Sequence, residues 1–337
     1  MKKIIIFVFC LSLSMACLAA YAGEKEKGYK IKRLAAQLYD RKYRMHSQRV
    51  LPSYGKDAVK YVLPLLDDKN NASIRVVALY ILGKIGDPSV QDKVITMLKD
   101  RDHRVRGEAA RTLTRIGAKK SVEPLKELLA DRDANVRFKA LRALASIAPK
   151  EETDLFIRSL EDFDPRIRRF SVMALGNIRS EEAIPYLSQL VQDYDPGVRM
   201  EIGKSLGKIG TADCLQPLYW LTKDQETGVS LVAMQSIAEI KGPQAERILV
   251  ETADSYDPSI ATRAIILLGD LKSPDALEVA KKYLDDEHMS VRLASIETLG
   301  KIGGEKEKAL LEPLLGAEST LVRRKAGGAL QAVNSRI

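Results

Sequence analysis

The sequence predicts an all-α fold of about ten helix–turn–helix repeats, each of about 31 residues. Two observations predict it: an aliphatic residue followed by Arg recurs at this fixed period, and a Leu or Ile stands seven positions after each anchor position. A fixed period of this size is typical of solenoids, in which each unit packs only on its neighbours. The arginines that mark the period are Arg75, Arg106, Arg137, Arg168, Arg199, Arg292 and Arg323.

Each repeat is expected to hold two short helices, as in residues 121–129 and 134–147. An Asp four residues before the anchor position can cap the second helix, Pro often opens it, and Gly can close it in a left-handed conformation. The capping and opening residues are Asp102, Asp133, Asp164, Asp195, Asp257, Pro165, Pro196 and Pro258. The closing glycines are Gly86, Gly117, Gly210 and Gly303.

We interpret the periodic arginines as a structural ladder. Each guanidinium can bind an Asp of its own or the adjacent inter-helix turn, which explains the Asp and the Arg together. The competing interpretation is an anion-binding stripe. Two anchor positions in the repeat register lack Arg, namely Ser230 and Ala261. The contacts between successive repeats are expected to be weaker there. This gap is a candidate hinge.

Residues 1–22 have the pattern of a secretory signal peptide. Lys2 and Lys3 precede an apolar run, and Ala20 and Ala22 occupy the positions that a signal peptidase recognises. We expect cleavage after Ala22 and a periplasmic or cell-envelope location. A retained anchor is the alternative, because a run of about 17 residues approaches the length of a membrane span. Of the three Cys, only Cys214 would then remain, which excludes a disulfide framework.

Of the net charge of +9, Lys2 and Lys3 contribute +2 and residues 23–56 contribute +7. Residues 23–56 carry ten basic and three acidic side chains, whereas residues 57–337 are balanced. This argues against nucleic-acid binding, which needs a basic stripe along the binding surface. Residues 23–56 are expected to contain a degenerate capping repeat, with Arg44, Leu51 and Gly55 in register, and residues 57–337 nine full repeats. The basic segment could touch an anionic membrane surface or act only as a soluble spacer.

The order of Asp, Val-Arg, Leu and Ile-Gly in residues 102–117 and 195–210 resembles the phycobilisome-lyase (PBS lyase) type of HEAT-like repeat. The resemblance covers roughly residues 29–337. It implies a right-handed α-solenoid, or superhelix, whose second helices line the concave face. It says little about function, because such repeats serve many roles.

The family includes bilin lyases and is similar to deoxyhypusine hydroxylases, which bind di-iron through His-Glu dipeptides. This sequence has His46, His103 and His288, none followed by Glu and each in a different repeat. Cys214 has no His nearby in the sequence. We therefore predict no catalytic site, no metal and no cofactor. The alternative is an enzyme or enzyme subunit related to those two classes.

Four aromatic residues are candidates for contact with a partner protein. Trp220 is the only Trp and stands where other repeats have mostly polar residues. Phe163, Tyr194 and Tyr256 precede the capping Asp of three repeats and could form one patch with it. The alternatives are a Trp folded over Tyr219 or Leu221, and rings packed on the prolines that follow.

A third candidate is the groove of second helices. Arg111, Arg142 and Lys204 occupy one repeat position, and later repeats carry Glu239, Asp270 and Glu297. A face that runs from basic to acidic could orient a charged partner, although ordinary solvated helices look similar. Together these observations predict a monomeric, exported scaffold that binds another protein of unknown identity.

Overall fold

The computed structural model describes residues 23–148 and 153–336, and the predicted signal peptide, residues 1–22, lies outside them. Every regular element within the described residues is helical. The prediction of an all-α repeat fold is therefore confirmed. The chain forms two compact units, Met1–Glu152 and Thr153–Ile337.

Unit 1, Met1–Glu152, alternates short first helices with longer second helices. It opens with a helix over residues 23–37, and its later second helices pack against one another, α4 on α6 and α6 on α8. The remaining elements are α2 (Arg41–Val50), α3 (Lys56–Val62), α4 (Ala72–Ile85), α5 (Gln91–Thr96), α6 (His103–Ile116), α7 (Val122–Glu127) and α8 (Ala134–Ile147).

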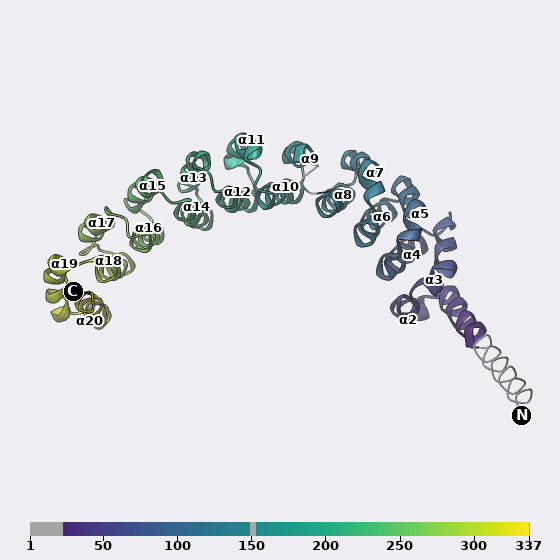
Figure 1. Cartoon of the computed structure of the whole chain (residues 1–337), viewed down its shortest axis with the longest axis horizontal. Helices are drawn as coiled ribbons and strands as arrows, with labels where there is room; N and C mark the ends of the chain where they lie inside the picture. The colour runs from purple at the N-terminus through teal and green to yellow at the C-terminus, as the bar shows by residue number, and fades with distance from the viewer. Residues whose placement is uncertain (1–22, 149–152, 337) are drawn as a thin grey trace, which may run out of the picture. The chain divides into compact units, whose positions relative to one another are not determined.

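Unit 2, Thr153–Ile337, continues the alternation. Its second helices stand side by side in one row and its first helices in another, as Figure 1 shows. The first helices are α9 (Thr153–Arg158), α11 (Ile184–Gln189), α13 (Leu215–Leu221), α15 (Pro243–Ala253), α17 (Ala276–Lys282) and α19 (Glu305–Leu311). The second helices are α10 (Pro165–Asn177), α12 (Pro196–Ile209), α14 (Thr227–Ile240), α16 (Pro258–Leu271), α18 (Met289–Ile302) and α20 (Thr320–Asn334).

The second helices begin where the sequence predicts. The Asp133 carboxylate accepts the backbone N–H of Asn135 at 2.8 Å, and Pro165 opens α10. Such caps satisfy N–H groups that have no partner within the helix. The expected single helix over residues 121–129 is instead α7 between two 3-10 segments, Lys119–Ser121 and Leu128–Ala130.

The core runs along the second helices. The Leu or Ile seven residues after each anchor is fully buried at Leu82, Leu113, Leu144, Leu175, Leu206, Ile237, Leu268 and Leu299. Adjacent second helices approach closely. The Ser205 hydroxyl donates to the Val172 carbonyl at 3.0 Å, and a Cβ on Gly176 would lie 2.5 Å from that hydroxyl oxygen. A glycine is therefore required where these two helices touch.

The helix ends follow the predicted glycines in three repeats and depart from them in one. Gly86, Gly117 and Gly210 have φ of 74°, 65° and 78°. Gly303 does not adopt the expected left-handed conformation, because its φ is −71°. There the Glu307 carboxylate accepts the Gly304 N–H at 2.8 Å and caps α19, so the chain enters the next helix directly.

The N-terminal helix pair keeps the repeat register. Asp40 caps α2 through the Lys42 N–H at 2.8 Å. Arg44 donates from Nε to the Leu38 carbonyl at 2.7 Å, as a ladder arginine would. After Val50 the chain passes into a 3-10 segment, because Pro52 cannot continue an α-helix.

Candidate functional site

The anchor arginines join each repeat to the next. Arg199 donates from Nε and Nη2 to the Asp224 carboxylate at 2.6 and 2.9 Å, and from Nη1 to the Asp193 carbonyl at 2.7 Å. Both side chains of the ion pair are buried, with exposed fractions of 6% and 5%. The guanidinium thus binds the turn of its own repeat and the turn of the following one. Pairs of the same kind include Arg75–Asp100, Arg106–Asp131 and Arg168–Asp193.

The acidic partners are not the capping residues. Asp224 and its equivalents stand two residues before the cap, where each also accepts the backbone N–H of the cap residue. These acidic residues repeat with the same period as the arginines but were not among those named as caps from the sequence. The two hydrogen bonds that the Arg168 guanidinium donates to the Asp193 carboxylate raise the pKa of Arg168. These arginines are therefore committed to structure rather than available to a ligand.

Beyond α12 the arginine–aspartate pairs between repeats are replaced by weaker contacts. Ser230 replaces the guanidinium with a single hydroxyl that donates to the Asp224 carbonyl at 3.2 Å. Arg292 and Arg323 bind turn carbonyls, and neither forms an ion pair with a carboxylate within residues 153–336. In the repeat after Arg292, Ala317 occupies the position that corresponds to Asp224, so the partner of the clamp is absent from the sequence.

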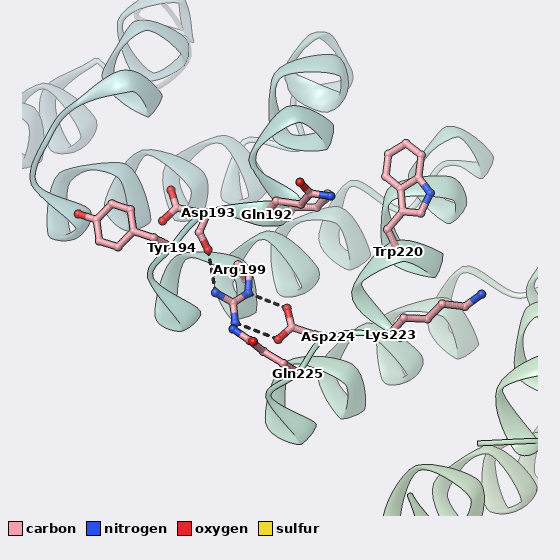
Figure 2. A pocket seen from close by; sticks show the side chains of 9 residues that line it. Gln192, Asp193, Tyr194, Arg199, Trp220, Lys223, Asp224 and Gln225 are labelled. Atoms are coloured by element: carbon pink, nitrogen blue, oxygen red, sulfur yellow. Dashed lines mark hydrogen bonds and ion pairs between the residues drawn. The ribbon is translucent and has the colours of Figure 1, made fainter. Parts of the chain in front are cut away.

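An open hollow of about 520 Å³ lies beside the Arg199–Asp224 pair in unit 2. Tyr194 and Trp220 line it on opposite sides of that pair, as Figure 2 shows. The Tyr194 ring is 71% exposed and the Trp220 indole is 49% exposed. Two of the predicted partner-binding residues thus share one hollow.

A second hollow of about 490 Å³ adjoins the first. Lys223 and Asp224 line both, and the exposed Tyr256 lines the second. The Lys223 amine binds the Tyr219 hydroxyl and lies 3.1 Å from Glu251 Oε1. The hydrogen bond from Tyr219 to Glu251, together with Lys223, lowers the pKa of the Glu251 carboxyl.

Phe163 is a further exposed aromatic residue, one repeat before Tyr194. Its side chain is 95% exposed, and its carbonyl accepts the Tyr194 hydroxyl at 3.3 Å. The Arg168 guanidinium lies 4.6 Å from the centre of the Tyr194 ring. We name the exposed set Phe163, Tyr194, Trp220 and Tyr256 the aromatic edge. Since Phe163 and Tyr256 are almost completely exposed, neither ring is packed on the proline that follows it.

The predicted groove residues fall into two places. Arg111 and Arg142 line one hollow of unit 1, whereas Lys204 lies exposed on α12 of unit 2 and does not line that hollow. Two of the acidic residues proposed for the far end of the groove are paired. Asp270 binds Lys301 and Glu297 binds Lys325, each from the following repeat. The expected acidic face is therefore largely neutralised.

Within the described residues, no three His, Cys, Asp or Glu side chains are grouped to hold a metal ion. His103 and His288 each lie near a single Asp, at 3.8 Å and 3.2 Å. Cys214 is buried, and burial raises the pKa of its thiol. No helix in residues 23–148 or 153–336 combines the length and the apolar character of a membrane span.

The sequence matches a family model described as HEAT repeats over residues 59–145, 92–162, 153–238 and 245–331. The chain belongs to the HEAT-repeat family. A comparison with curated proteins finds no match. Among solved structures, the HEAT repeats superimpose on Kap121p with a TM-score of 0.70 and 14% identity, over 92% of this chain and 42% of Kap121p.

Two other structures are similar to this HEAT-repeat chain at TM-scores below 0.5. Human deoxyhypusine hydroxylase in complex with glycerol has a TM-score of 0.33 and 18% identity, over 93% of this chain and 99% of its own. The complex of CpcE and CpcF of phycocyanin lyase from Nostoc has a TM-score of 0.40 and 19% identity, over 72% of this chain and 94% of its own. The likeness to Kap121p shows the solenoid fold.

Proposed function

We propose that this HEAT-repeat protein is a scaffold that holds another protein along the aromatic edge of unit 2. One observation carries the proposal: the exposed side chains of Tyr194, Trp220 and Tyr256 border two adjoining hollows, and the exposed Phe163 lies one repeat before Tyr194. Exposed Trp and Tyr in a contiguous patch are typical of binding surfaces, because they bury much area for little conformational entropy. A solenoid presents such a surface without needing a pocket.

The proposal includes three features carried over from the sequence. They are the phycobilisome-lyase type of repeat, the export directed by residues 1–22, and the absence of a catalytic site. Two His residues in different repeats, His103 beside Asp133 and His288 beside Asp286 and Glu287, together with a buried thiol, support the last of these. Purified protein that carries a metal ion or a chromophore would instead support an enzyme related to bilin lyases or deoxyhypusine hydroxylases. N-terminal sequencing of the envelope fraction tests the cleavage after Ala22.

We also propose that the basic segment, residues 23–56, makes weak contact with an anionic membrane surface. Tyr29 and Met45 are about 70% exposed in this segment, which is rich in basic side chains. Exposed apolar or aromatic side chains next to cations suit the headgroup region of a membrane. Sedimentation with vesicles of phosphatidylglycerol and phosphatidylcholine tests the contact. Binding only to the anionic vesicles, weakened by salt, is the expected result.

The scaffold proposal is tested by photocrosslinking in the native cells. A benzophenone amino acid replaces Phe163 or Tyr256, whose side chains extend into solvent, so neither replacement should disturb the fold. The control replaces Tyr186 on α11, which is 46% exposed in the same unit but lines neither hollow. We expect both edge positions to capture the same protein and the control position not to capture it.

The Trp220→Ala variant completes the test. Removal of the indole from a half-exposed position should leave the fold intact and abolish capture at both edge positions. The Trp220→Phe variant should retain part of the capture, because it keeps an aromatic ring. Equal capture at Tyr186, or capture that Trp220→Ala leaves unchanged, would show that the aromatic edge does not hold the partner.

A further inference from the structure

The hollow of unit 1 that contains Arg111 and Arg142 has a chemistry unlike that of the aromatic edge. Its volume is about 530 Å³, and it lies on the second helices α6 and α8. Four of its lining side chains are cationic, namely Arg111, Arg115, Lys139 and Arg142. All four lie in unit 1, so the cluster is complete within one compact body.

Three of these cations have no acidic partner among the described residues. Arg111 is held by Glu108 through hydrogen bonds of 2.7 to 3.1 Å. Arg115, Lys139 and Arg142 form no ion pair with a carboxylate anywhere in the part of the chain that the structure describes. By contrast, Lys301 and Lys325 on the equivalent helices of unit 2 are each paired. The hollow thus gathers positive charge that the protein does not neutralise.

Two of the cationic side chains, Lys139 and Arg115, pack against glycines of the preceding second helix. A Cβ on Gly107 would lie 3.1 Å from Lys139 Nζ, and one on Gly83 would lie 3.3 Å from Arg115 Cδ. Both long side chains therefore lie against a glycine of the preceding second helix. This contact holds their stems along the helix surface and limits the conformations of their charged ends.

Aromatic rings orient the guanidinium groups. Arg111 and Arg115 each lie 5.5 Å from the centre of the Tyr80 ring, and Arg142 lies 5.8 Å from that of Phe138. A guanidinium that stacks on a ring keeps its N–H edge free, and this edge matches a carboxylate through two parallel hydrogen bonds. Because cations already lie over both rings, the rings offer poor platforms for nucleic-acid bases, which bind single strands by stacking.

The spacing of the cations fits an extended chain. Arg115 lies on α6, whereas Lys139 and Arg142 lie on α8 of the next repeat, and packed helices stand about 8–10 Å apart. An extended polypeptide rises about 3.3 Å per residue, so every third side chain advances by the same distance. Residues 57–337 have no net charge, which argues against the long basic stripe that a nucleic-acid duplex requires.

We propose that the hollow between α6 and α8 binds an extended acidic segment of a partner protein, with carboxylates about three residues apart, one on Arg115 of α6 and the next on Lys139 and Arg142 of α8. This inference rests on the proposed scaffold function and names the chemistry of a second contact with the partner. The acidic segment supplies the negative charge that the three cations lack.

Fluorescence anisotropy on the purified full chain tests the inference. One labelled peptide repeats Asp-Gly-Ser five times, and a second has the same composition with its five Asp residues consecutive. Labelled oligothymidylate represents nucleic acid. We expect the periodic peptide to bind more tightly than either of the others, with an affinity that falls as salt is added.

Two matched variants locate the site. The triple variant Arg115→Gln, Lys139→Gln and Arg142→Gln should weaken binding of the periodic peptide at least tenfold. The control variant, Lys69→Gln, Lys119→Gln and Arg132→Gln, removes the same charge from exposed positions of unit 1 and should change binding less than twofold. Circular dichroism establishes that both variants are folded. Charge reversal at Arg115→Glu and Arg142→Glu should transfer the preference to a periodic Lys peptide.

Three results would overturn the inference: an affinity that the triple variant does not change, equal affinity for both acidic peptides, or tighter binding of oligothymidylate that the triple variant abolishes. Photocrosslinking at Phe163 and Tyr256 reports on the scaffold function separately. If capture there persists while the periodic peptide fails to bind, only the acidic-segment inference is wrong. If capture is also lost, the scaffold proposal itself fails.

Discussion

Arg168 of one repeat and Asp193 of the next form a buried bidentate ion pair, with Nε–Oδ2 and Nη2–Oδ1 distances both 2.7 Å. The exposed fractions of the two side chains are 6% and 4%. The same guanidinium donates to the Asp162 carbonyl at 2.8 Å. One side chain therefore links the turns of two successive repeats.

Removal of this guanidinium should be costly. Arg168→Ala leaves the Asp193 carboxylate buried without its cation, and we expect the free energy of unfolding to fall by about 3 kcal/mol. Arg323→Ala is the matched control, because Arg323 binds only the turn carbonyls of Ala317 and Glu318. Its cost should be about 1 kcal/mol. Urea unfolding measures both, and equal losses would show that the carboxylate partner adds nothing.

Of the two anchor positions without Arg, Ala261 should accept an arginine and Ser230 should not. Ala261→Arg places a guanidinium at the repeat position whose acidic partner is Asp286, and Asp286 is free to accept it apart from its contact with His288. We expect amide hydrogen exchange in α16 and α18 to slow by roughly fivefold, or about 1 kcal/mol. In the unmodified protein, the backbone amides of α14 and α16 should exchange hydrogen faster than those of α10 and α12.

Ser230→Arg is the control for that repair. Its equivalent acidic position is Ser255, so the new guanidinium would be buried without a carboxylate. This variant should destabilise the protein, since a buried unpaired charge is costly. Slower exchange in both variants would contradict the proposed role of the Asp.

Lys241 should be replaceable by glycine with a gain in stability. Its backbone has φ 63° and ψ 178°, a region that glycine enters readily and other residues rarely occupy. Lys241→Gly should raise the free energy of unfolding by about 1 kcal/mol. Lys241→Ala removes the same side chain but keeps Cβ, so it should leave stability nearly unchanged. Thermal or urea unfolding of the pair distinguishes relief of backbone strain from loss of the ammonium group.

Glu307 gives α19 a pH-dependent cap. Its carboxylate accepts the Gly304 N–H, and that hydrogen bond lowers the pKa of Glu307 below the ordinary value. A lowered pKa adds stability above the unfolded value of about 4.3, and this stability is lost as the pH falls through the folded value. Glu307→Gln should therefore cost about 1 kcal/mol at neutral pH and less in acid.

Unfolding of the Glu307→Gln variant over the range from neutral to acid pH measures this dependence. Glu305→Gln, at an exposed position of the same first turn, is the control, since Glu305 forms a 3.6 Å ion pair with Lys308 and caps no backbone N–H among the described residues. A difference for Glu307→Gln that does not change with pH would refute the role of the carboxylate charge.

The repeat register was predictable because each repeat meets the same neighbours. The cap at Asp133, the start of α10 at Pro165 and the burial of Leu144 all follow from local rules that recur. The acidic partners of the arginines carried the same period, at Asp100, Asp131, Asp193 and Asp224. The sequence predicted a partner Asp in the inter-helix turn, but it did not distinguish these residues from the capping Asp two positions later.

The contents of the hollows were less predictable. Tyr80 occupies the repeat position of Arg111 and Arg142, so nothing in its sequence register indicates that two guanidinium groups stack on it. The neutralisation of Glu297 by Lys325 depends on side-chain lengths across two helices. Periodicity predicts which residues share a face, but the pairing of charges on that face depends on three-dimensional distances.

The offset between Arg and Asp in each ladder pair determines where the protein can be divided. A fragment that ended at Gly210, after a complete helix pair, would separate Arg199 from Asp224 and leave a guanidinium without its carboxylate. A fragment that ended after Asp224 would keep the pair. The independent unit of this chain is therefore offset from its helix pairs: it runs from turn to turn, and fragment boundaries belong after the acidic residue instead of after the helix.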